Sequence, residues 1–180
     1  MKNLTSVVLH TAFERARTYR LPVLMTSTTG KTAKAMLDIV KDAPVRLIVL
    51  THDPRRVGPQ TAFDLEVRQR LLAGGHTFLE DEAPWLPSIT ISRLLEMAFN
   101  LSSLTPQQRL WTRKYGIGGK VCFLMTHKVI KAGLLRTGES CVCLGGSRSG
   151  CDTALQMRVS CRGNRLFPEV ESVLVSALKK

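Results

Sequence analysis

One stretch decides the fold of this chain: residues 21–40, which read LPVLMTSTTGKTAKAMLDIV. Its first five residues, 21–25, form an apolar run long enough for a buried strand. Residues 33–40 then carry apolar side chains at spacings of one, three and four (Ala35, Met36, Ile39 and Val40), which is typical of the buried face of a helix. The stretch therefore predicts a strand, a polar turn and a helix in immediate succession.

The polar turn, residues 26–32, is rich in hydroxyl side chains and contains Gly30 and Lys31. A helix start leaves backbone N–H groups unpaired and carries partial positive charge, so an anion binds there favourably. Serine and threonine are also preferred helix caps, so a capped helix start without a ligand remains an alternative. The Gly-Lys-Thr sequence is not a nucleotide triphosphate loop, because the earlier glycine of that motif would fall at Met25.

The first half of the chain repeats this alternation of strands and helices. Apolar periodicity predicts helices over residues 4–20 and 61–72 and further strands over 46–50 and 76–79, with a loop at 55–59. Short connections between such elements are typical of a parallel sheet covered by helices on both faces. At 180 residues the chain is expected to form one domain, residues 1–180.

The second half has a less regular pattern. It predicts helices over 88–100 and 105–115, the latter ended by Gly116, Gly118 and Gly119. The remaining expected elements are a strand over 121–125, a short helix over 127–132, strands over 140–144 and 153–159, and a closing helix over 167–178.

Composition limits the class of protein. No apolar run approaches the roughly 20 residues that span a bilayer, and the first residues show no secretory signal, so we expect a cytoplasmic protein without a membrane segment. The five cysteines are expected to be reduced and mostly buried, with Cys141 and Cys143 on one face of a strand. Their spacing does not match common zinc sites, and we expect no metal site.

The chain has 26 Lys and Arg against 14 Asp and Glu, a net charge of +12. This excess raises nucleic acid as a partner. However, the basic residues are spread along the sequence without a run of five or six like charges, and aromatic residues make up only 6%. The pattern alone therefore gives nucleic-acid binding only weak support.

Small and polar residues gather after three predicted strands, at residues 26–32, 51–58 and 145–153. In open parallel sheets, ligands bind outside the carboxyl ends of the strands, so the three segments are expected to converge on one crevice. The glycine-rich segment 145–153 is either an anion-binding loop or a turn between two strands. Its Asp152 either contacts a ligand or caps that turn.

The sequence does not identify catalytic residues. His52 and His127 each follow a predicted strand without an obvious catalytic partner, and Cys151 shows no sign of an activated thiol. The chain is therefore expected to be a ligand-binding protein rather than an enzyme of recognisable mechanism.

Three segments, residues 24–33, 48–52 and 145–154, resemble the C-terminal α/β domain of pyruvate kinase, and more closely the small stand-alone proteins made of that domain. The likeness runs from about Leu4 to Arg158. It implies a Rossmann-like three-layer α/β/α sandwich with a mostly parallel sheet. Pyruvate kinase activity is not implied, because the catalytic barrel has no counterpart in these 180 residues.

The resemblance also implies a ligand. The stand-alone relatives resemble binders of flavin mononucleotide (FMN), with the flavin phosphate on the loop that matches residues 27–32. Carried onto this sequence, the implied cofactor-binding residues are Ser27, Thr28, Thr29, Gly30, Lys31, Thr32, Thr51, His52, Gly146, Ser147, Arg148, Gly150 and Asp152.

Three hypotheses follow in order. The first is a binding domain for a phosphorylated small molecule, with FMN as the first candidate. The second is a flavin-dependent oxidoreductase, and the third is a basic nucleic-acid-binding module.

The chain departs from the relatives in lacking their first strand, in carrying Asp53-Pro54 after His52, and in having Cys151 where alanine is usual. The missing strand leaves a sheet edge, which favours a homodimer or covering by another segment.

Overall fold

The computed structural model describes residues 4–41, 43–52, 62–81, 106–147, 150–163 and 165–176. The helices of this part are α1 (Leu4–Tyr19), α2 (Lys31–Val40), α4 (Leu65–Ala73) and α6 (Pro106–Lys131). The strands are β1 (Val23–Thr26), β2 (Leu47–His52), β3 (Thr77–Asp81), β4 (Ser140–Ser147), β5 (Gly150–Arg162) and β6 (Arg165–Val175). No helix among the described residues is both long enough and apolar enough to cross a bilayer.

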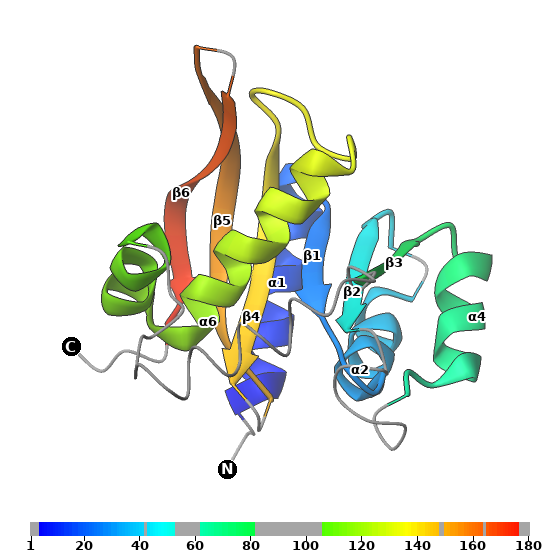
Figure 1. Cartoon of the computed structure of the whole chain (residues 1–180). Coiled ribbons are helices and arrows are strands. Elements are labelled where there is room, and N and C mark those ends of the chain that lie inside the picture. The colour runs from blue at the N-terminus through cyan, green and yellow to red at the C-terminus, as the bar shows by residue number, and fades with distance from the viewer. Residues whose placement is uncertain are drawn as a thin grey trace, which may run out of the picture.

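The strands form one mixed sheet in the order β3-β2-β1-β4-β5-β6 (Figure 1). The four strands β3, β2, β1 and β4 are parallel to one another, whereas β5 and β6 are added as antiparallel strands. The prediction of a mostly parallel sheet is thus correct for β3, β2, β1 and β4. It is wrong for the last two strands, because a short hairpin turn can only join antiparallel neighbours.

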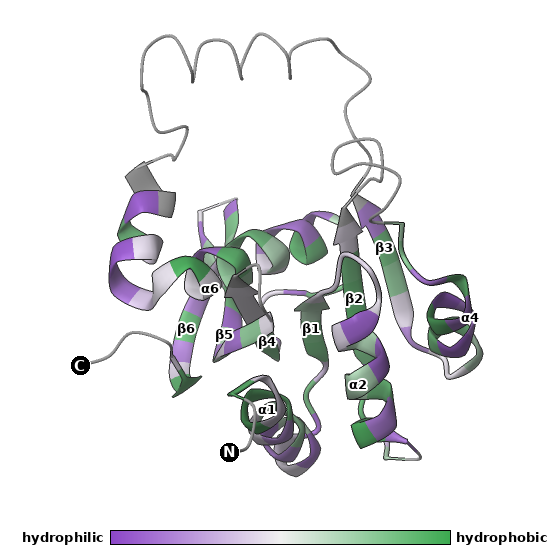
Figure 2. Cartoon of the chain, turned by 90° about the horizontal axis from the view of Figure 1, so that it is seen from below, coloured by the Kyte–Doolittle hydropathy of each residue, from purple (hydrophilic) through white to green (hydrophobic). Residues whose placement is uncertain are grey.

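Successive residues of β1 point to opposite faces of the sheet, as the pleat requires. Val23 and Met25 pack with α1, α2 and α4, while Leu24 packs with α6 on the other face. Figure 2 shows α1 and α2 on one side of the sheet and α6 on the other. The described residues therefore form the three layers that the sequence predicts.

Most predicted elements of the first half are confirmed with shifts of a few residues at their ends. These are the helices at 4–20, 33–40 and 61–72 and the strands at 21–25, 46–50 and 76–79. The cysteine prediction also holds, since four of the five are buried and Cys141 and Cys143 lie in the same cluster under α6. The predicted loop at 55–59 and the predicted helix at 88–100 lie outside the described residues.

The strand predicted over 121–125 is wrong, because these residues lie inside α6. Cys122, Met125 and Val129 are buried against the sheet at spacings of three and four, which is the period of a helix. A short apolar run fits a buried strand and a buried helix equally well, and the three preceding glycines look like a stop signal. The structure instead uses Gly116 (φ 74°, ψ −172°) as a kink, and the predicted helices at 105–115 and 127–132 become parts of one kinked helix.

The closing helix predicted over 167–178 is also wrong, because residues 165–175 form the edge strand β6. This segment pairs with residues 154–162 of β5, so the backbone hydrogen bonds of the sheet replace those of a helix. Pro168 suits this position, since proline is tolerated in edge strands.

Among the described residues, the segment 145–153 belongs to two paired strands, and residues 148 and 149 between them lie outside the described part of the chain. β4 continues through Gly145 and Gly146 to Ser147, and β5 begins at Gly150. A register shift between Gly145 and Gly146 marks a bulge at this end of the hairpin.

Candidate functional site

A cleft of about 1180 Å³ lies at the carboxyl ends of β1, β2 and β4. The chain proceeds from β1 towards β2 and β3 on one side and returns to β4 on the other, so β1 and β4 flank the point where the strand order reverses. Ligands of open α/β sheets bind in the crevice at this point, because loops diverge there. The position of the cleft agrees with the predicted convergence of the strand ends.

The loop after β1 forms the polar wall of the cleft. Its conformation is fixed by two hydroxyl groups: the Ser27 hydroxyl accepts a hydrogen bond from the N–H of Ala33 (3.4 Å), and the Thr51 hydroxyl donates one to the carbonyl of Thr28 (3.2 Å). Ser27 is buried, whereas the side chains of Thr28 and Thr29 are more exposed. Ser27 and Thr51 therefore hold the loop in place, and the neighbouring threonines face the open space.

The helix that follows begins at Gly30, whose backbone is left-handed (φ 89°). The nearest neighbour of a side chain at this position is Asp64, whose Cβ lies 3.2 Å from a Cβ built on Gly30. Gly30 thus allows the loop to approach the start of α4. Among the described residues, the backbone N–H groups of Lys31 and Thr32 have no acceptor, so they remain available at the cleft.

The β4–β5 hairpin forms the floor on the other side of β1. Gly145, Gly146, Gly150 and Cys151 line the cleft there. A Cβ on Gly146 would collide with the carbonyl oxygen of Gly150, and one on Gly150 would meet the hydroxyl of Thr5 in α1. These glycines are therefore required by the close packing of the hairpin and α1, whether or not a ligand is bound.

Two further walls of the cleft were not found by reasoning from the sequence. Thr5, Ser6, Leu9 and His10 reach it from α1, and Ile117, Val121, Leu124, Met125 and Lys128 reach it from α6. The sequence pattern does not predict the α6 wall, because the apolar run at residues 121–125 also fits a strand. The helical spacing of Val121, Met125 and Lys128 is the signal that could have revealed it.

The structure brings together most of the predicted cofactor-binding residues. Those that line the cleft are Ser27, Thr28, Thr29, Lys31, Thr32, Thr51, Gly146 and Gly150. Gly30 lies in the same loop. His52 ends β2 and Ser147 ends β4, but their side chains are not described, and Arg148 lies outside the described residues.

Asp152 does not line the cleft. Its carboxylate accepts a hydrogen bond from the hydroxyl of Thr153 (2.8 Å) and lies 2.6 Å from a Cβ built on Gly118 of α6. The side chain therefore lies on the α6 side of the hairpin, whereas its neighbour Cys151 packs on the α1 side.

The Cys151 thiol, which lines the cleft, is not an activated nucleophile. Burial raises the pKa of the Cys151 thiol to about 12, and this thiol donates to the carbonyl of Gly145 (3.2 Å). It therefore stays protonated at neutral pH and is a poor nucleophile. Burial and the neighbouring charge of Lys131 lower the pKa of His127. Within the described part of the chain, no three metal-ligating side chains are grouped to hold an ion.

The sheet, its two helical layers and the cleft at the switch point define a protein of the doubly wound α/β class. No protein-family model matches the chain. Two structures of pyruvate kinase from Cryptosporidium parvum match with a TM-score of 0.43 each, at 12% and 13% identity, over 88% and 87% of this chain. A structure of the SAH-bound methyltransferase PaMTH1 from Podospora anserina matches at a TM-score of 0.29 and 15% identity, over 73% of this chain and 49% of the methyltransferase.

The chain spans 23% of the length of the pyruvate kinases that it matches.

Proposed function

We propose that this chain binds a phosphorylated small molecule in the cleft, with FMN as the first candidate. The proposal rests mainly on the kinds of residue that line the cleft. The cleft joins a hydroxyl-rich loop at the start of a helix to an apolar wall within one continuous space. A flavin nucleotide has the same division between a phosphate and a large planar ring.

The phosphate would bind at the start of α2. The N–H groups of Lys31 and Thr32, the hydroxyl groups of Thr28 and Thr29, and the positive end of the helix all favour a doubly charged anion. The ammonium group of Lys31 is exposed at the rim of the cleft and adds a full positive charge. Charge-assisted hydrogen bonds of this kind are stronger than neutral ones.

The flavin ring would lie along the apolar side chains that line the cleft at the strand ends. These are Leu9, Met25, Ile39, Leu50, Ile117, Val121, Leu124, Met125 and Leu144. Ligand pockets are typically lined by apolar side chains with a few polar groups that set the orientation. The volume of the cleft is large enough for a nucleotide-sized molecule.

A titration with FMN and riboflavin tests the proposal, because the two ligands share the ring and differ in the phosphate. We expect FMN to bind more tightly, and Lys31→Glu to weaken FMN about tenfold, which is about 1.4 kcal/mol, while leaving riboflavin binding unchanged. Lys34→Glu is the matched control: it makes the same charge change one turn along α2, at an exposed residue that does not line the cleft.

Equal affinity for FMN and riboflavin, or equal effects of the two lysine variants, would contradict a phosphate site at α2. Absence of binding to both ligands would reject the flavin. If FMN binds, anaerobic addition of NADH separates a binding protein from the oxidoreductase alternative. Bleaching of the flavin absorbance would indicate reduction, and an unchanged spectrum would leave ligand binding as the function.

A further inference from the structure

The helix α6 has an unusual charge. Its 26 residues contain six Lys and Arg and no Asp or Glu (Arg109, Arg113, Lys114, Lys120, Lys128 and Lys131). The helix forms the outer layer on its side of the sheet, lying in front of β4 and β5 in Figure 1. One helical layer of the structure therefore carries six basic residues and no acidic ones.

Four of these side chains form what we call the α6 cluster: Arg113, Lys114, Lys120 and Lys131. Three of them are exposed and Lys120 is half-buried. None takes part in an ion pair with another described residue, whereas the described ion pairs lie on α1, α2, α4, β3, β5 and β6. The positive charge of the cluster is thus not neutralised by neighbouring carboxylates within the described residues.

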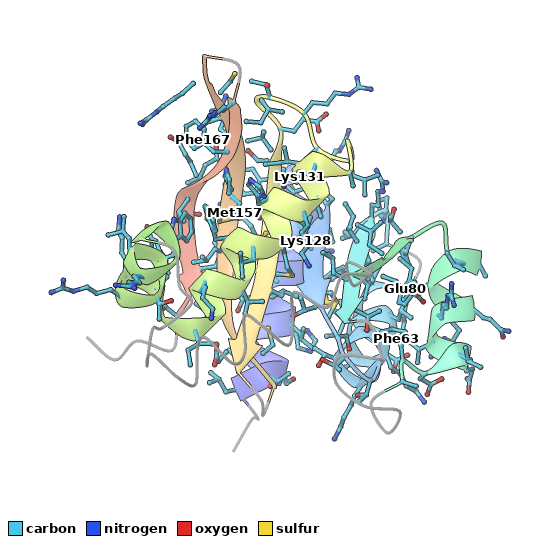
Figure 3. All side chains as sticks on the ribbon, in the orientation of Figure 1. Phe63, Glu80, Lys128, Lys131, Met157 and Phe167 are labelled. Atoms are coloured by element: carbon cyan, nitrogen blue, oxygen red, sulfur yellow. The ribbon has the colours of Figure 1, made fainter. Side chains whose placement is uncertain are left out.

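The cluster extends over both halves of the kinked helix. The first half, with Arg113 and Lys114, lies beside β6, and the second half crosses the sheet to Lys131 (Figure 1). From Lys120 to Lys131 the helix rises about 16 Å. Figure 3 labels Lys128 and Lys131 on this second half of α6.

Aromatic rings accompany the charges in the first half. The rings of Trp111 and Tyr115 lie 5.2 Å apart and are half-buried, and the ammonium group of Lys114 lies 5.1 Å from the ring of Tyr115. Basic side chains next to partly exposed aromatic rings are the combination that single-stranded nucleic acids bind, through phosphates and stacked bases.

We propose that the outer surface of α6 binds the polyphosphate backbone of a nucleic acid. The partner is identified by charge complementarity: only a polyanion offers repeated negative charges along the length of the cluster. An anionic membrane is the less suitable partner, since a helix that inserts into a bilayer needs a continuous exposed apolar face. The second half of α6 instead buries its apolar face on the sheet, through Cys122, Met125 and Val129, and the large exposed apolar side chains described on the helix are the two separate residues Leu110 and Ile117.

This surface is separate from the proposed phosphate loop at α2. Arg113 and Lys131 do not line the cleft, so they can be changed without touching the candidate ligand site. The double variant Arg113→Gln/Lys131→Gln is therefore the test. The control is Lys34→Gln/Lys41→Gln, which removes the same charge from exposed positions of and just after α2, on the opposite face.

The experiment measures binding of fluorescein-labelled 20-nucleotide single-stranded RNA and of a 20-base-pair DNA duplex by fluorescence anisotropy, from about 50 to 200 mM salt. We expect salt-dependent binding to one or both. The Arg113→Gln/Lys131→Gln variant should bind the nucleic acid about tenfold more weakly. The slope of the logarithm of the association constant against the logarithm of the salt concentration should become smaller in magnitude by about 1.4 for the single strand or about 1.8 for the duplex. The control should keep the wild-type slope and most of the affinity, and melting temperatures check that both variants are folded.

Three results would overturn the proposal. Equal losses in the two variants would mean that binding follows total charge and not the α6 surface. Binding to neither nucleic acid at about 50 mM salt would reject the partner. If the α6 variant instead loses binding only to vesicles that contain one quarter phosphatidylserine, the surface belongs to a membrane and not to nucleic acid.

Discussion

At the scale of single residues, two hydroxyl groups and one glycine determine the shape of the loop after β1. Ser27 and Thr51 use their hydroxyl groups on backbone partners within the protein. Gly30 takes a left-handed backbone that other residues adopt only at a cost. The loop is therefore shaped by internal contacts before any ligand binds.

We expect Gly30→Ala to lower the free energy of unfolding by about 1–2 kcal/mol, because alanine is strained at this φ. Its Cβ would also lie 3.2 Å from that of Asp64. Gly75→Ala is the control for strain alone, since Gly75 has φ 72° and open space around it. Urea denaturation of the two variants measures the difference. A Gly30→Ala loss no larger than that of Gly75→Ala would contradict a role of the Asp64 contact.

At the scale of elements, the helix α6 and the strand β6 are where local sequence patterns fail. The pattern of 121–125 is compatible with strand and helix, and the tertiary partner decides between them. For 167–178, the free β5 edge offers a continuous row of hydrogen-bonding groups, and pairing with it outweighs helical propensity. Residues 121–125 pack on strands that are distant in the sequence, whereas β6 pairs with the strand directly before it, whose free edge the sequence pattern does not reveal.

The glycines of α6 serve close packing rather than termination. A Cβ on Gly118 would lie 2.6 Å from the Asp152 carboxylate and would collide with the Thr153 hydroxyl. We therefore expect Gly118→Ala to lower the free energy of unfolding by about 1–3 kcal/mol through overpacking.

Gly145→Ala should act at the same contact from the sheet side, because its Cβ would collide with the Gly118 carbonyl oxygen. A double-mutant cycle of the two variants should show non-additive losses, as expected for residues in contact. Additive losses measured by urea denaturation would show that the two glycines do not share one contact.

At the scale of the whole molecule, the fold collects features that are far apart in the sequence. Segments near residues 5, 27, 51, 121 and 146 meet in one cleft, whereas the basic residues from 109 to 131 belong to one helix, which the tertiary structure places on the outside of the sheet. The two proposed sites therefore depend on tertiary structure, and a change in global stability affects both.

Global stability should depend on pH through two histidines. Burial lowers the pKa of His76, whose Nδ1 accepts the N–H of Leu47 (3.3 Å), and burial and Lys131 lower the pKa of His127. Below the unfolded pKa of 6.5 the unfolded chain binds more protons than the folded chain. The stabilisation by the neutral histidines is thus complete above this pH and is lost as the pH falls.

Urea denaturation at about pH 7.5 and about pH 5.5 checks this sign. The wild type should be less stable at the lower pH, and His76→Gln/His127→Gln should lose less stability between the two values. An equal loss in the variant would show that carboxylates or other groups cause the acid effect.

The sequence by itself determined the alternation of strands and helices in the first half, the α/β class and the loop at residues 27–32. These features follow from local periodicity and from the chemistry of adjacent residues, which act over a few positions. Only the tertiary structure decided that residues 121–125 are helical, that 165–175 form an edge strand, and that Asp152 faces α6 instead of the cleft. The first and the third depend on contacts with segments distant in the sequence, and the second depends on pairing with the neighbouring strand β5. In each case the free energy of the tertiary contact exceeds the small local preferences that a sequence pattern expresses.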